Sequence, residues 1–519
     1  GYAAGAAVTT GTFNTLIGGL AGDAITTALN NTAVGYASLG ANTTASNNTA
    51  VGTSALLANT TGDSNVAVGK SALTANTTAA DNTAVGRSAL LANTTGASNT
   101  AVGKDALLAN TTADNNTAVG YTAGAAVTTG IRNTLIGSEA GDAITTGANN
   151  VAVGALALTA DTLGSKSVAI GRGALRDQNF TTATDSHNIA VGYSAGQSVT
   201  TGVNNTIVGG LAGDAITTGD YNVALGMTTL STNTAANKNV AIGAQALADF
   251  NVTSDTDTYN VAVGYAAGAA VTTGTFNTLI GGLAGDAITT GIRNTAVGQQ
   301  SFSTNTTGGL NTALGRSALF SNTTASNNTA VGYEALYANT TGTENVAVGA
   351  YAGDAITTGV HNVAVGTYAL TATTTGDHNV AIGRSALEAN TTATGNTAVG
   401  NHALLANTTG ASNTGLGKSA LAANTTGDYN VAVGQGALDA NTTADYNSAL
   451  GYDALGGNTT GTQNVGVGSY ALRLNTTGIQ NTSVGYEALD RNTTGSYNVA
   501  VGREAAKNVT TGDFNVAIG

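Results

Sequence analysis

Three kinds of side chain in this sequence have the chemistry for catalysis, metal binding or modification: histidine, aspartate, and asparagine followed by threonine. The four histidines are His187, His361, His378 and His402. Acid–base catalysis or metal binding would need several such groups converging on a pocket. We interpret the four as separate surface residues, so the sequence predicts no catalytic residue, no metal site, no cofactor and no enzyme.

Five aspartates recur in one hexapeptide, Gly-Asp-Ala-Ile-Thr-Thr, and they are Asp23, Asp142, Asp214, Asp286 and Asp354. Calcium takes about six or more oxygen ligands, and one carboxylate per hexapeptide does not supply them. Aspartate is common in turns because its side chain bonds to nearby backbone. We therefore interpret these residues as solvated corner aspartates.

Asparagine also opens a repeated Asn-Thr-Thr sequence, for example at Asn42, Asn59, Asn76 and Asn93. Asn-x-Thr is the acceptor pattern for N-glycosylation, which takes place on exposed loops of exported proteins. These four residues are the predicted candidate glycosylation sites. The alternative is a turn asparagine followed by a threonine-rich strand start.

The elements that position all these residues are copies of one short repeat. The pentapeptide Asn31-Thr32-Ala33-Val34-Gly35 returns along the whole chain, and its closing glycines are 17 residues apart in 28 copies and 21 apart in two. No helical period persists, whereas short β-rich runs broken by Gly and Asn fit strands and corners. The sequence predicts an all-β parallel β-solenoid of 30 coils, continuous over residues 1–519. Loop insertions are expected within 172–191 and 244–263.

Composition excludes several classes of function. Charged residues make up only 9% of the 519 residues and the net charge is −13, so no basic stripe is available for nucleic acid. There is no Cys for disulfides or thiolate zinc sites, and no Pro to interrupt a sheet ladder. No apolar run is long enough to span a membrane. Since both ends fall on the repeat glycine, we expect a section of a longer chain or a processed product.

Stacked coils would place equivalent residues in columns. The repeat glycine, as in Gly35, Gly52, Gly69 and Gly86, fits a corner that needs positive φ and lets the next coil approach closely. The asparagine four residues before it is present in 29 of 30 coils, as in Asn31, Asn48, Asn65 and Asn82, with Ser167 the one replacement. Amides in such a column can hydrogen-bond from coil to coil. We predict a structural ladder of these asparagines and glycines.

Counting from the repeat glycine as position 0, positions 4 and 7 vary together. Position 4 is Leu or Phe in 18 of the 17-residue coils, and position 7 is then polar, as in Leu56 and Asn59. In the other ten, position 4 is Gly or Ala and position 7 is Val or Ile, as in Gly22 and Ile25. One large apolar side chain per coil indicates that both positions face one narrow, close-packed interior.

The strand residues predict a second buried face. Alternation places positions 14 and 16 on one face and position 15 on the other. Position 15 is mostly Ala and never charged, which is typical of strands buried on both sides. We expect positions 14 and 16, Val68 among them, to line the coil interior. The alanine column, as in Ala33, Ala50, Ala67 and Ala84, is then predicted to be an interchain face in a homo-oligomer, a trimer or filament.

The pentapeptide resembles the YadA-like head repeat of trimeric autotransporter adhesins, most closely at Ser167–Gly171, Asn239–Gly243 and Asn379–Gly383. Similar repeats occur in phage tail fibres. The resemblance implies a left-handed β-roll of three chains on a bacterial surface that binds host matrix or other cells. It favours an extracellular fibre or adhesin shaft for cell-surface attachment. The alternatives are a phage tail-fibre shaft and an ice-binding solenoid with columns of threonine.

Overall fold

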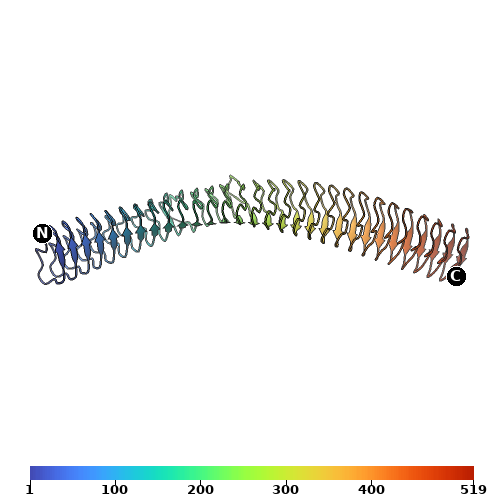
Figure 1. Cartoon of the computed structure of the whole chain (residues 1–519), viewed down its shortest axis with the longest axis horizontal. Coiled ribbons are helices and arrows are strands. Elements are labelled where there is room, and N and C mark those ends of the chain that lie inside the picture. The colour runs from blue at the N-terminus through green and yellow to red at the C-terminus, as the bar shows by residue number, and fades with distance from the viewer. The chain divides into compact units, whose positions relative to one another are not determined.

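The computed structural model describes residues 1–519, in strands and connecting turns without a helix. The chain divides into two compact units, Gly1–Asn260 (unit 1) and Val261–Gly519 (unit 2). Both units are stacks of the same coil, drawn in Figure 1 as one short arrow and one loop per coil. The predicted parallel β-solenoid of about 30 coils of roughly 17 residues is confirmed. No helix that could cross a membrane is present.

Unit 1, blue to green in Figure 1, has one three-residue strand per coil. These strands are β1 (Thr15–Ile17), β2 (Thr32–Val34), β3 (Thr49–Val51), β4 (Val66–Val68), β5 (Thr83–Val85), β6 (Thr100–Val102), β7 (Thr117–Val119), β8 (Thr134–Ile136), β9 (Val151–Val153), β11 (Val168–Ile170), β13 (Ile189–Val191), β14 (Thr206–Val208), β15 (Val223–Leu225) and β17 (Val240–Ile242). Two further short pairs flank the loop insertions: β10 (Gly164–Ser165) with β12 (Thr184–Asp185), and β16 (Ala236–Asn237) with β18 (Thr256–Asp257).

Unit 2, yellow-green to red in Figure 1, repeats the pattern without insertions. Its strands are β19 (Val261–Val263), β20 (Thr278–Ile280), β21 (Thr295–Val297), β22 (Thr312–Leu314), β23 (Thr329–Val331), β24 (Val346–Val348), β25 (Val363–Val365), β26 (Val380–Ile382), β27 (Thr397–Val399), β28 (Thr414–Leu416), β29 (Val431–Val433), β30 (Ser448–Leu450), β31 (Val465–Val467), β32 (Thr482–Val484), β33 (Val499–Val501) and β34 (Val516–Ile518).

Successive strands within a unit pair in parallel and in register. Thr32 lies opposite Thr49, Ala33 opposite Ala50, and Val34 opposite Val51. Since neighbouring strands are about 4.8 Å apart, each residue meets its own equivalent one coil away. The 17-residue period therefore sets the register.

The repeat glycine has a steric cause. Gly52 adopts φ +135°, and a Cβ on it would lie 2.5 Å from the carbonyl oxygen of Gly69. No side chain fits between coils that approach this closely, and the conformation itself is unfavourable for L-residues. Gly35, Gly69 and Gly86 meet the next coil in the same way, as the glycine prediction required.

The interior is filled from two alternative positions, as the covariation of positions 4 and 7 predicts. Leu56 at position 4 is fully buried and adopts φ 50°, a strained conformation for leucine that its burial offsets. Where position 4 is Gly22, a Cβ there would lie 2.7 Å from Leu16 Cδ2 and 2.8 Å from Ile25 Cδ1. The space of the missing leucine is thus taken by Leu16 at position 15 and Ile25 at position 7.

The prediction of which strand face is buried was wrong. Ala33, Ala50, Ala67 and Ala84 have no solvent-exposed surface within one chain, so they line the coil interior and cannot form an interchain face. Positions 14 and 16, including Val68, are only partly buried and point outward. Alternation along a strand means that position 15 points to the opposite face from positions 14 and 16, but it does not say which face is inside. The narrow interior already holds Leu56 or its equivalent, which leaves room only for alanine.

Candidate functional site

The predicted asparagine ladder forms, and its main bonds run from side chain to backbone. Asn31 Oδ1 accepts a hydrogen bond from the backbone N–H of Asn48 (2.9 Å), and Asn48 Oδ1 accepts one from Asn65 (2.8 Å). Asn48 Nδ2 donates to the carbonyl of Gly62 in the next coil (3.0 Å). Asn82 continues the column in the same way. Each of these side-chain amides is hydrogen-bonded within the stack of coils. The column is therefore structural and offers no group to a ligand.

A second amide ladder is made by the residues predicted to be glycosylated. Asn42, Asn59, Asn76 and Asn93 are fully buried. Asn59 Nδ2 donates to the Gly62 carbonyl (2.9 Å), Asn76 Nδ2 to Asn59 Oδ1 (2.9 Å) and Asn93 Nδ2 to Asn76 Oδ1 (3.0 Å). A glycan on any of these nitrogens has no room in the folded coil. The glycosylation prediction is therefore incompatible with this fold.

A column of exposed apolar side chains runs along the outer strand face, which we define as the side chains at positions 14 and 16. Position 16 is Val, Ile or Leu in all 30 coils. Leu314 is 45% exposed and Leu450 is 51% exposed. Since neighbouring coils cover each side chain from above and below, the exposed part is what faces outward. Contiguous apolar surface of this extent is typical of an interaction site.

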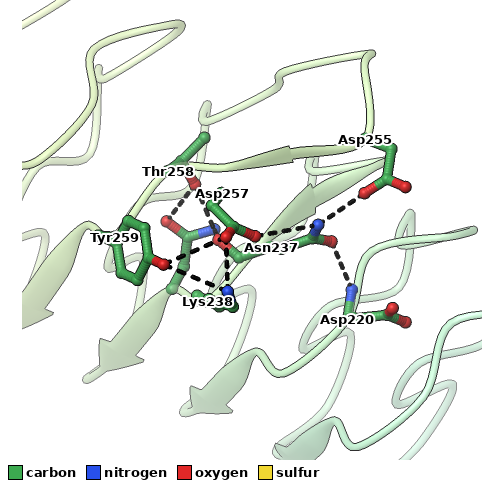
Figure 2. Close-up of polar contacts among 8 residues, drawn as sticks. Asp220, Asn237, Lys238, Asp255, Asp257, Thr258 and Tyr259 are labelled. Atoms are coloured by element: carbon green, nitrogen blue, oxygen red, sulfur yellow. Dashed lines mark hydrogen bonds and ion pairs between the residues drawn. The ribbon is translucent and has the colours of Figure 1, made fainter.

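The second loop insertion is held by a charged network around Lys238 (Figure 2). Lys238 Nζ donates to Asp257 Oδ2 (2.5 Å) and to the hydroxyl of Tyr259 (3.2 Å), which itself donates to Asp257 (3.1 Å). This ion pair lowers the pKa of Asp257 and raises the pKa of Lys238. Asn237 Nδ2 donates to Asp255 Oδ1 (2.6 Å). The network pins the base of the loop and leaves residues 253–256 exposed.

The first insertion is built in the same way. Lys166 Nζ donates to Asp185 Oδ2 (2.6 Å), which lowers the pKa of Asp185. In both loops an inserted hydroxyl reaches the ladder: Ser186 contacts Ser167 Oγ (2.5 Å), and Thr258 Oγ1 donates to Asn239 Oδ1 (2.8 Å). The recurring lysine and aspartate, 19 residues apart, fasten each loop to the preceding coil.

The aspartates of the Gly-Asp-Ala-Ile-Thr-Thr sequence are less solvated than predicted. All five are only partly exposed. Burial raises the pKa of Asp142 and of Asp214, and it raises the pKa of Asp354 to about 6. One carboxylate oxygen of each of these three has no hydrogen-bond partner. They are half-buried acids held by the coil rather than solvated corners.

The prediction that the four histidines are separate from one another is wrong for two of them. His361 and His378 occupy position 12 of consecutive coils, their rings stack at 4.8 Å, and His361 Nε2 lies 2.8 Å from Glu344 Oε2. Tyr429 stacks on Tyr446 at 5.2 Å in the same column. The signal that could have found these pairs is their 17-residue spacing, which the register converts into contact. His187 also directly precedes a ladder asparagine, but the neighbouring coils carry Lys166 and Asn204 at that place, and His402 is at position 2 of its coil.

No group of three or more histidine and acidic side chains comes together in a way that could hold a metal ion. The structure thus forms three kinds of feature from the repeated residues: two amide ladders, the outer strand face and two fastened loops. It does not bring together a catalytic constellation from the residues considered in the sequence. A comparison of the sequence with known family models found no match, and a comparison with curated proteins found none either.

Proposed function

We propose that the chain is the shaft of an extracellular fibre or cell-surface adhesin, in which copies pack side by side through the outer strand face. One observation supports this most directly: position 16 is aliphatic in every coil although it points outward. A face that met only water would carry charged residues in some of 30 coils. An aliphatic column of this length is expected to be covered by another protein surface.

The partner we favour is another copy of the chain. Every coil presents an aliphatic residue at position 16 and an uncharged residue (Thr, Val, Ile or Ser) at position 14, so one register of contact can be repeated along a unit. The resemblance to trimeric adhesin heads supports the same choice, as well as a location outside the cell. The homo-oligomer predicted from the sequence is retained, and its interface moves from the buried alanines to positions 14 and 16.

The test is the mass of the particle in solution, measured by light scattering with circular dichroism as a check on folding. Alternating charges on three adjacent coils of the outer strand face avoid repulsion within the chain: Val68→Lys, Val85→Glu and Val102→Lys. The matched control changes three exposed residues elsewhere on the same coils: Thr61→Lys, Thr78→Glu and Thr95→Lys.

We expect the parent and the control to be oligomers, and the face variant to have lower mass with its coils intact. A monomeric parent, or a face variant of unchanged mass, would contradict the assembly. Ala67→Glu serves as a third comparison. Because it places a charge in the interior, it should damage the coil itself rather than the contact between chains.

Ice binding has one observation in its favour. Position 14 is Thr in half of the coils, and these hydroxyl-bearing side chains lie on the outward face at about 4.8 Å spacing. Two facts weigh against it: position 16 beside them is always aliphatic, and threonines of the Asn-Thr-Thr sequence, such as Thr60, donate to the next coil (Thr60 Oγ1 to Thr77 O, 3.0 Å). Thermal hysteresis of the purified chain would support ice binding over the shaft.

A further inference from the structure

A hollow of about 240 Å³ opens on the side of unit 2, across the three consecutive coils that begin at Gly417, Gly434 and Gly451. Its residues are at positions 1, 2 and 5 of their coils, so none of them belongs to the outer strand face. Its walls include Lys418, Gln435, Gly436, Asp439, Tyr452 and Asp453.

The hollow exists because one side chain is missing from a column. Position 2 carries Ser419, Gly436 and Asp453 in the three coils, with φ values of 57°, 68° and 54°. The backbone is therefore the same in all three, and only the middle coil lacks a side chain. The register places Lys418, Gln435 and Tyr452 beside this gap at position 1 of the same coils.

The wall chemistry combines donors, acceptors and one aromatic ring. Lys418 and Gln435 bear N–H donors, and Asp439 and Asp453 bear acceptors. Asp439 and Asp453 line the same hollow, and partial burial together with the charge of Asp453 raises the pKa of Asp439. The ring of Tyr452 meets that of Tyr470 edge-on, with centroids 5.2 Å apart and planes at 82°. This contact holds the tyrosine in place at the rim.

Such a wall suits a small, uncharged ligand with many hydroxyl groups. Each hydroxyl both donates and accepts, so it can use a carboxylate and an ammonium or amide together. Two carboxylates against one lysine disfavour an anion. The aromatic ring supplies an apolar surface for C–H groups.

We propose that this hollow binds one uncharged sugar unit of a glycan, with Asp439 and Asp453 accepting from its hydroxyls, Lys418 and Gln435 donating, and Tyr452 packing on its C–H face. The site is contained in one chain, so it goes beyond the proposed shaft and does not depend on assembly.

The test is saturation-transfer NMR with the full chain and millimolar methyl glycosides of glucose, galactose, mannose and N-acetylglucosamine, with glucuronate as the anionic probe. Gly436→Ser introduces into the hollow the side chain that Ser419 already carries at the same position and a similar φ (57° against 68°). Gly173→Ser is the matched control, because Gly173 is also at position 2, adopts φ 69°, and a Cβ on it would meet only Ser194 Oγ, at an ordinary contact distance of 3.6 Å.

We expect transfer to at least one uncharged glycoside, a loss of at least fivefold in Gly436→Ser, and no loss in Gly173→Ser. Asp439→Asn should weaken the transfer without emptying the site. Absence of transfer to every uncharged glycoside, equal transfer in Gly436→Ser, or glucuronate binding as strongly as the uncharged sugars would each overturn the proposal. None of these outcomes alters the particle mass, so failure here is distinct from failure of the shaft assembly.

Discussion

Gln178 donates its side-chain amide to Ser167 (Nε2–Oγ, 2.7 Å), and this contact explains the one coil that lacks the ladder asparagine. The same nitrogen donates to the buried carboxylate of Asp161 (2.7 Å), and Gln178 Oε1 accepts from Asn188 Nδ2 (2.9 Å). One glutamine thus joins the two interior amide columns. The shorter serine leaves the room that the longer side chain needs.

Replacing Gln178 by leucine should destabilise this coil by about 2–3 kcal/mol. The change removes the amide whose hydrogen bond offsets part of the free-energy cost of burying the Asp161 carboxylate. Burial already raises the pKa of Asp161. Hydrogen exchange over residues 161–190 measures the loss. Gln480→Leu is the control, because the side-chain amide of Gln480 donates to the exposed Gln463 (2.9 Å), and the change should alter stability by less than about 0.5 kcal/mol. Equal effects of the two changes would contradict the buried network.

Two adjacent glycines test the cause of the glycine column. A Cβ on Gly281 would lie 2.5 Å from the carbonyl oxygen of Gly298 at φ +134°, whereas a Cβ on Gly282 would meet nothing within 4 Å. Gly281→Ala should cost at least about 2 kcal/mol, while Gly282→Ala should be close to neutral. Thermal melting of the two variants gives the comparison. Similar melting temperatures would mean that the coils separate easily at this corner.

Asp354 should make unit 2 less stable as the pH rises. Its folded pKa of about 6 is above its unfolded value of 3.8, so its contribution is fully present below pH 3.8 and is lost as the pH rises through about 6. The shift corresponds to about 3 kcal/mol, of which solvent screening at this half-buried site leaves about 1 kcal/mol. Asp354→Asn should remove this pH dependence and stabilise the coil at pH 7. Hydrogen exchange over residues 349–365 at pH 4 and pH 7 measures the change.

Asp257 should give the opposite dependence of stability on pH in the same experiment. Its pKa is lowered by Lys238, so its contribution is present at neutral pH and is lost as the pH falls through the folded pKa. Asp257→Asn should loosen the loop at pH 7 and have no effect at low pH. If both aspartate variants responded to pH in the same direction, the burial of Asp354 would not be the cause.

Expression in a secretory host that performs N-glycosylation tests the burial of the Asn-Thr-Thr sequences. Folded, secreted protein should carry no glycan at Asn59 or Asn76, because their Nδ2 atoms are bonded inside the coil. Peptide mapping by mass spectrometry measures the occupancy. Fully occupied sites in protein with intact β-sheet circular dichroism would contradict the ladder.

The sequence was sufficient for the period, the register and the exchange between Leu56-type and Gly22-type coils. Each of these follows from stacking equivalent residues, a constraint that the chain displays about 30 times. Gly52 and Gly69 could be understood in the same way, since a close approach between coils excludes a Cβ.

The inside and the outside of the strand could not be assigned from alternation alone. Ala67 and Val68 are both apolar, so either could face the interior. Ala67 does so because Leu56 already fills most of the narrow interior and leaves room only for a small side chain. That leucine sits at φ 50°, a conformation that sequence patterns do not predict for leucine. The burial of Asn59 was missed for a related reason. The Asn-x-Thr glycosylation pattern describes three residues and carries no information on the Gly62 carbonyl to which the Asn59 amide donates.

Leu16 places its Cδ1 and Cδ2 atoms where a Cβ on Gly5, in its own coil, and one on Gly22, in the next coil, would have to be. Leu135 has the same relation to Gly124 and Gly141. A recombination event that placed a coil with leucine at position 4 directly after the coil of Leu16 or Leu135 would therefore create an atomic overlap. The coil that carries the large position-15 side chain must therefore be copied or moved together with the glycine-bearing coil that follows it, which matches the recurrence of the coil pair at Gly1, Gly120, Gly192 and Gly264.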